Sequence, residues 1–103
     1  MIDVEVPMDV LSDSIKLHGM QIKKVICAEE MSELIKEICK DLRGEVRRND
    51  LIEEVADVYI CLNMLKLMYD IKDSDIQQWS DYKIERQVKR DWEYAHNKNR
   101  GSK

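Results

Sequence analysis

Glycine and proline are scarce in this chain, and their scarcity limits what it can fold into. Its 103 residues include three glycines and a single proline, Pro7, and phenylalanine is absent. A protein rich in sheets needs frequent turns, which these two residues supply, whereas leucine, isoleucine, methionine, glutamate and lysine suit helices. The sequence therefore predicts an all-α protein, with residues 1–103 forming one domain.

Apolar spacing and helix-ending residues divide the chain into one short and three long helices. The short helix is expected from Asp9 to about Leu17, after an extended lead-in and before a break at "HGM". The long helices are expected over 20–43, from Asn49 or Asp50 to Tyr69 or Asp70, and from Asp73 or Ser74 to about Tyr94. Gly44 ends the first of them, and residues 97–103 are expected to form a flexible tail.

Two of the long helices carry acids three residues apart, Glu30 with Glu33 and Glu54 with Asp57. Residues at this spacing share one helix face and can reach one ligand. Glu54 also falls within the apolar stripe of its helix, which is formed by Leu51, Val55, Val58, Leu62, Leu65 and Tyr69. Burying an unpaired neutral polar group costs about 2–7 kcal/mol, and burying an unpaired carboxylate costs more. No lysine or arginine lies on that stripe, so a divalent cation is the natural counter-charge.

Oxygen-only ligation suits a hard ion, so these acids predict Mg²⁺, with Mn²⁺ as a second possibility. Because Mg²⁺ keeps coordination positions for waters and phosphate oxygens, a phosphorylated substrate is implied. The alternative is an ordinary solvated acidic face, since glutamates on helices usually face water and one such pair is a weak signal.

Net charge and composition argue against several other classes of protein. The net charge of −4 argues against a nucleic-acid-binding protein, and no apolar run reaches the length of a membrane span. The first residues lack the basic start and apolar core of a signal peptide, so the cytoplasm is the expected location. Cys27, Cys39 and Cys61 show no CxxC spacing and are expected to be small buried apolar residues in a reducing compartment.

The two acidic motifs and the segment after them resemble one known family. "AEEMSELIKEICK", "NDLIEEVADVYICLNMLK" and "DYKIERQVKR" are similar, in order and spacing, to the motif helices of MazG-like all-α nucleoside triphosphate pyrophosphohydrolases. The resemblance covers residues 20–90. It implies a helical bundle whose four-helix-type core is completed by oligomerisation, as a dimer or a tetramer.

The resemblance also implies a reaction, the Mg²⁺-dependent hydrolysis of a nucleoside triphosphate to the monophosphate and pyrophosphate. Carried over by position, Glu30, Glu33, Glu54 and Asp57 would be catalytic metal ligands. Lys83 would be a catalytic phosphate-binding residue, and Arg86 would assist it. Two other interpretations remain open, a non-catalytic oligomerisation module and a nucleotide sensor. Base preference, the number of metal ions and the identity of the general base are not readable from the sequence.

Overall fold

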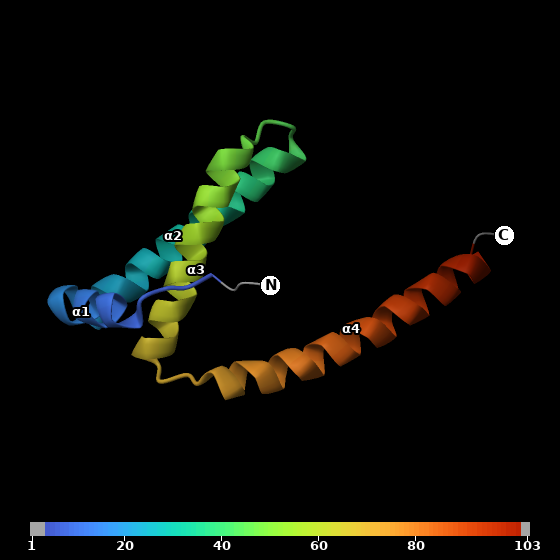
Figure 1. Cartoon of the computed structure of the whole chain (residues 1–103). Helices are drawn as coiled ribbons and strands as arrows, with labels where there is room; N and C mark the ends of the chain where they lie inside the picture. Colours follow the sequence, from blue (N-terminus) through green and yellow to red (C-terminus); the bar gives the residue numbers. More distant parts are fainter. Residues whose placement is uncertain (1–3, 102–103) are drawn as a thin grey trace. The chain divides into compact units, whose positions relative to one another are not determined.

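The computed structural model describes residues 4–101, and over this range the chain is helical without any strand, which confirms the predicted all-α class (Figure 1). The helices are α1 (Met8–His18), α2 (Met20–Leu42), α3 (Arg48–Met68) and α4 (Asp73–Gly101). They fall into two compact units, the first ending at Asp70 and the second beginning at Ile71. The expectation of one domain over 1–103 stays a prediction.

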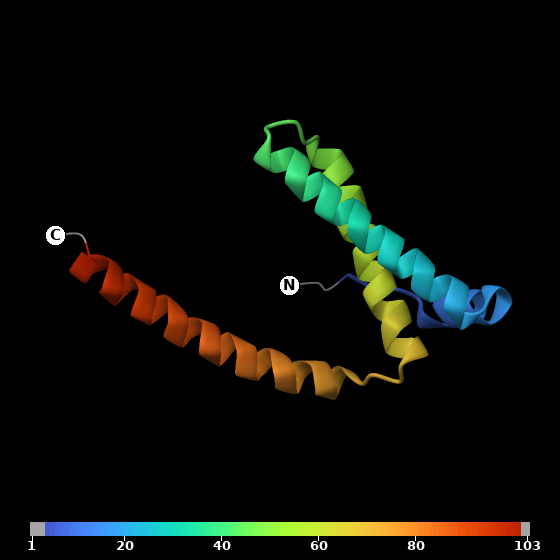
Figure 2. The same ribbon diagram turned by 180° about the vertical axis from the view of Figure 1, so that it is seen from behind.

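The first unit is built on a hairpin of α2 and α3. The two helices lie side by side in both views, and the short connection between them reverses the chain direction (Figures 1 and 2). α1 packs against both of them. This antiparallel pairing brings the middle of α2, with Glu30, beside the middle of α3, with Asp57, which is what positions the candidate site.

Glycines end both of the first two helices. Gly19 has φ 91° and ψ 149°, a backbone conformation open almost only to glycine, and it separates α1 from α2. Gly44 has φ 75° and closes α2 with a Schellman motif, in which Gly44 N–H donates to the Asp41 carbonyl and Glu45 N–H to the Lys40 carbonyl. The predicted stop at Gly44 is confirmed.

Two predicted helix boundaries are wrong. α3 begins at Arg48, so Asn49 and Asp50 lie inside its first turn and neither caps it. α4 continues to Gly101, past the end expected near Tyr94. At the start of α4 the Asp75 carboxylate accepts a hydrogen bond from Lys72 N–H, which satisfies a backbone donor that helix geometry leaves free.

The core of the first unit is small. Its buried apolar side chains come from all three helices: Leu11, Ile15, Cys27, Cys61 and Met64. Partly buried residues surround them, among them Met31 and Leu65. Cys39 is exposed, so the prediction of three buried cysteines is wrong at that position.

The apolar face that the sequence indicated for α3 is not the buried one. Val55, Leu62 and Tyr69 were expected in the stripe with Leu65, yet each is about half exposed. The reason is that α3 carries apolar residues on every side, and only the face with Cys61 and Met64 meets α1 and α2. A helix that is apolar all round is normally covered on all sides.

No helix within the described range combines the length and the apolar character that crossing a membrane requires.

Candidate metal centre

Three of the predicted site residues converge between α2 and α3. Glu30 on α2 and Glu54 and Asp57 on α3 each offer one carboxylate oxygen, and these oxygens lie within 4.8 Å of one another. All three residues are partly buried. They meet because the hairpin sets one turn of α2 against one turn of α3, so that acids spaced three apart on α3 face a single acid on α2.

The pKa of Glu30 shows the cost of bringing these carboxylates together. Burial, the strongest influence, raises the pKa of the Glu30 carboxyl, and a hydrogen bond shared with Asp57 raises it further. The negative charges of Asp57, Glu54 and Glu33 act in the same direction. The charged form of Glu30 is therefore disfavoured until a positive charge enters the cluster.

Glu54 experiences the same forces. Burial is again the strongest influence that raises the pKa of its carboxyl. The negative charges of four neighbouring acids raise it further: Asp57, Glu33, Glu53 and Glu37. Its Oε2 atom is shielded from solvent and has no hydrogen-bond partner. A buried oxygen without a partner leaves a coordination position that a cation can fill.

Glu33 lies one helical turn beyond Glu30, and its side chain is exposed. Its carboxylate is outside the group of three converging oxygens, although its charge acts on both Glu30 and Glu54. The role of Glu33 as a fourth ligand stays a prediction.

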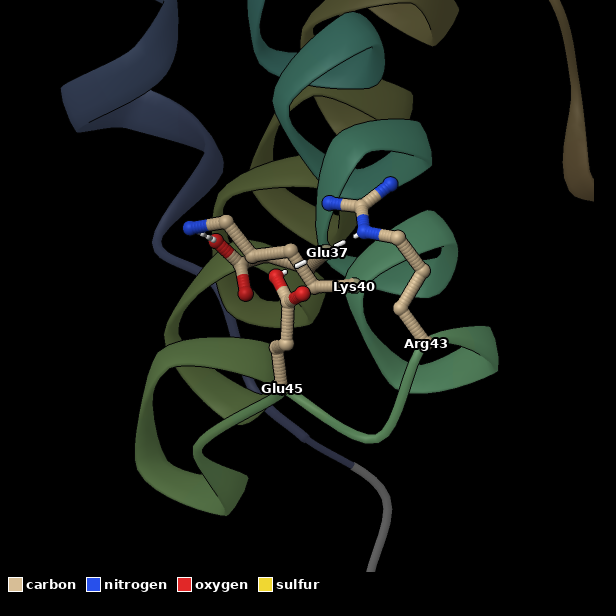
Figure 3. Close-up of polar contacts among 4 residues, drawn as sticks. All are labelled: Glu37, Lys40, Arg43 and Glu45. Carbon is tan, nitrogen blue, oxygen red and sulfur yellow. Dashed lines mark hydrogen bonds and ion pairs between the residues drawn. The ribbon is translucent and has the colours of Figure 1, made fainter.

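Glu37 is a site residue that sequence reasoning did not select. Glu37 is only 7% exposed, and among the residues that the structure describes no other charged residue is buried. Its Oε1 accepts a bond from Lys40 Nζ at 3.2 Å, whereas its Oε2 is buried without a partner (Figure 3). The signal was present in the spacing, because Glu37 follows Glu30 by two helical turns and so shares its face.

A pair of buried thiols lies close to the acids. Cys27 Sγ is 3.8 Å from the Cys61 carbonyl oxygen, to which it donates. Burial raises the pKa of the Cys61 thiol to about 12, with smaller contributions from Cys27, Glu30 and Asp57. The Cys61 thiol therefore stays protonated at neutral pH in the metal-free protein, and the donor atoms that converge at the site are carboxylate oxygens.

Lys83 and Arg86, the predicted phosphate-binding residues, belong to α4 in the second unit. Both are exposed, and Lys83 shares a helix face with Trp79 and Ile84. The Arg86 guanidinium lies over the Tyr82 ring, 5.6 Å from its centroid. Their predicted contact with phosphate stays a prediction.

Comparison of the chain with protein-family models, with curated proteins and with solved structures found no match.

Proposed function

We propose that this chain is a Mg²⁺-dependent nucleoside triphosphate pyrophosphohydrolase of the MazG-like type. The observation that supports the proposal best is the convergence of Glu30, Glu54 and Asp57, because the motif resemblance assigns all three as ligands. The sequence places the two motifs more than twenty residues apart, and only the hairpin brings them together.

The residues present suit a hard divalent cation. The donors are carboxylate oxygens, which Mg²⁺ and Mn²⁺ prefer, and the unpartnered Glu54 Oε2 is an open acceptor. The pKa values of Glu30 and Glu54 are raised first by burial and then by the negative charges around them, and a bound cation would offset both influences. Glu30, Glu54 and Asp57 would hold the ion, with Glu33 as a further candidate.

When bound, Mg²⁺ would supply charge neutralisation for the triphosphate and would lower the pKa of a coordinated water. A carboxylate of the cluster accepts the proton of the attacking water. The motif resemblance assigns to Lys83, with Arg86, the role of stabilising the charge that would develop on the phosphoryl oxygens. The water oxygen bonds to the α-phosphorus while the bond from this phosphorus to the oxygen bridging the α- and β-phosphates breaks, so pyrophosphate leaves and the nucleoside monophosphate remains.

We also propose that the protein works as a homo-oligomer, dimer or tetramer, in the cytoplasm. The outward face of α3 is apolar, with Ile52 and Val55 each 50% exposed and Tyr59 and Ile60 partly exposed beside them. A face of this composition on a helix that is apolar all round favours coverage by another apolar surface. A second copy brings the same face, which suits a symmetric self-contact.

Product analysis tests the enzyme proposal. Purified full-length protein is incubated with Mg²⁺ and a panel of canonical, deoxy and oxidised nucleoside triphosphates, and pyrophosphate and orthophosphate are assayed separately. We expect pyrophosphate with the nucleoside monophosphate, lost when the metal is chelated. Orthophosphate with the diphosphate would instead mean a different phosphohydrolase reaction.

The two rival functions give different results in the same experiment. A nucleotide sensor binds the triphosphate with Mg²⁺ and releases no product. An oligomerisation module shows neither turnover nor any effect of Mg²⁺ on its melting temperature. Either result, with protein shown to be folded by circular dichroism, would replace the enzyme proposal.

A further inference from the structure

The face of α2 that carries the acids ends in a lysine. Glu30, Glu37 and Lys40 lie within one stripe of the helix, because they are seven and then three residues apart. A helix rises 1.5 Å per residue, which puts Lys40 about 15 Å along α2 from Glu30 and about 4.5 Å from Glu37. Helical side chains lean toward the N-terminus, so Lys40 leans back toward the acids, where it meets Glu37 (Figure 3).

The Glu37 carboxylate positions the Lys40 ammonium by accepting its hydrogen bond. The Glu37 side chain is 9% exposed, and its Oε1 accepts the bond from Lys40 Nζ at 3.2 Å. Its charge is close enough to Glu54 to contribute to the raised pKa of that carboxyl. One oxygen of the Glu37 carboxylate therefore pairs with Lys40, while the other is buried without a partner.

The Lys40 ammonium can donate further hydrogen bonds. A lysine ammonium has three donors, and one of them is directed to Glu37. The Lys40 side chain is 33% exposed, so its end can be reached from solvent. A pair that is buried on one side and open on the other adds little stability, because desolvation of Glu37 opposes the attraction. The arrangement instead fixes a cation beside Glu37, whose charge acts on Glu54 of the acid cluster.

We propose that Lys40 is a phosphate-binding residue, positioned by Glu37, which receives the phosphates of the substrate that lie beyond the metal ligands. This inference rests on the proposed function. Phosphate oxygens are repelled by a cluster of carboxylates, and a lysine at its edge offers the compensating point charge. Lys40 does so from the same helix as Glu30, in addition to the lysine predicted on α4.

Calorimetry with inorganic tripolyphosphate and Mg²⁺ on the full-length chain tests the proposal without requiring turnover. We expect Lys40→Gln, which keeps most of the side-chain length, to weaken binding about 10–100-fold, the loss of a hydrogen bond to a charged group. Lys40→Arg should restore most of the affinity, because the charge returns. Lys36→Gln, an exposed lysine of the same helix, is the matched control and should bind like the wild type.

A structural role predicts a different pattern. If Lys40 served only to neutralise Glu37, Lys40→Gln would lower the melting temperature and leave the tripolyphosphate affinity within about twofold of the wild type, which would overturn the proposal. The shift of melting temperature by Mg²⁺ alone is measured beside it. We expect Lys40→Gln to keep that shift, since Lys40 is not a ligand, and loss of the shift would contradict a separate phosphate role.

The outcome separates this inference from the proposed function. Tripolyphosphate binding that depends on Lys40, without hydrolysis of any nucleoside triphosphate, would retain Lys40 as a phosphate-binding residue and remove the enzyme proposal. If Lys40→Gln still hydrolysed the substrate with an unchanged KM, the enzyme proposal would be retained and the phosphate-binding role of Lys40 would be removed. Failure of the wild-type protein to bind tripolyphosphate with Mg²⁺ would overturn the role of Lys40.

Discussion

Glu54 is the residue at which folding and function oppose each other most directly. Its carboxylate is partly buried, with one oxygen unpartnered and several negative charges around it. Such a group disfavours the folded state while it stays charged and without a cation. A protein that keeps it must gain something from the charge, and metal binding is the gain that the proposed function supplies.

Replacing Glu54 by glutamine should separate the two effects. Glu54→Gln removes the charge and keeps the shape, so we expect the metal-free melting temperature to rise by a few degrees. The stabilisation by Mg²⁺ should disappear, and kcat/KM should fall at least about 100-fold, since even outer partners of a metal ligand cost about 10–100-fold. Thermal melts with and without Mg²⁺ and a pyrophosphate assay measure these effects.

Glu93→Gln is the control for Glu54→Gln, because it removes the same charge at an exposed position of α4. It should melt, respond to Mg²⁺ and turn over like the wild type. A Glu54→Gln protein that is less stable than the wild type and still responds to Mg²⁺ would show that this carboxylate is a structural group.

The same carboxyls predict how metal-free stability depends on pH. The pKa values of Glu30 and Glu54 are raised from their ordinary 4.5, so the folded protein holds these protons more tightly than the unfolded chain. Their destabilising effect is absent below pH 4.5 and develops as the pH rises through the raised pKa values. The stability gain of Glu54→Gln over the wild type should therefore be small in acid and larger at neutral pH.

Melting temperatures of both proteins across this pH range, in the presence of a chelator, measure the difference directly. Carboxyls remote from Glu54 affect both proteins alike and cancel. Glu30 does not cancel, because the Glu54 charge raises its pKa, and its contribution enlarges the difference in the same direction. A difference that does not change with pH would mean that the Glu54 charge plays no part in the stability of the metal-free fold.

At the scale of the helix, the connection between α1 and α2 depends on one glycine. Gly19→Ala introduces no clash, because nothing lies within 4 Å of the added Cβ, yet φ 91° with ψ 149° is strained for any other residue. We expect a loss of about 1–3 kcal/mol in the free energy of unfolding. Urea unfolding followed by circular dichroism measures it.

Gly44→Asn provides the comparison at the other positive-φ glycine. Gly44 has φ 75° at the end of α2, a setting that asparagine tolerates, so a much smaller loss is expected. If Gly19→Ala were as stable as the wild type, the helix break would have to relax into another conformation, and the angle between α1 and α2 would not be fixed by Gly19.

For the whole molecule, the half-exposed apolar face of α3 predicts self-association. Residues 4–7 lie beside this face, where the Tyr59 hydroxyl donates to the Val4 carbonyl at 3.1 Å, yet Ile52 and Val55 stay 50% exposed. The buried core of the first unit is small, and the apolar residues that remain exposed on α3 favour a contact with another copy. We expect sedimentation to show a dimer or tetramer. Ile52→Lys, which puts a charge at this half-exposed face, should shift the protein toward monomer.

Leu17→Lys is the matched control for that change. Leu17 is 78% exposed on α1 and lies away from the face of α3, so the variant should keep the wild-type mass. A wild-type protein that sediments as a monomer at every concentration would contradict the oligomer, as would an Ile52→Lys protein whose association equals that of the wild type.

The sequence by itself determined the number and order of the helices and which acids could form a site, although it misplaced the start of α3 and the end of α4. The breaks at Gly19 and Gly44 were readable because backbone freedom is a local property of glycine. The pairing of Glu30 with Asp57 and Glu54 was expected from spacing and family resemblance, both of which are present in the chain order.

Only the tertiary structure decided which sides of the helices are buried. α3 is apolar on every side, so periodicity could not distinguish the face that holds Cys61 and Met64 from the one that exposes Val55. The burial of Glu37 likewise depends on what packs against that turn of α2, whereas its bond to Lys40, three residues on, is local to the helix. Burial depends on which two surfaces come into contact, and the residue pattern along one helix does not specify the surface that covers it.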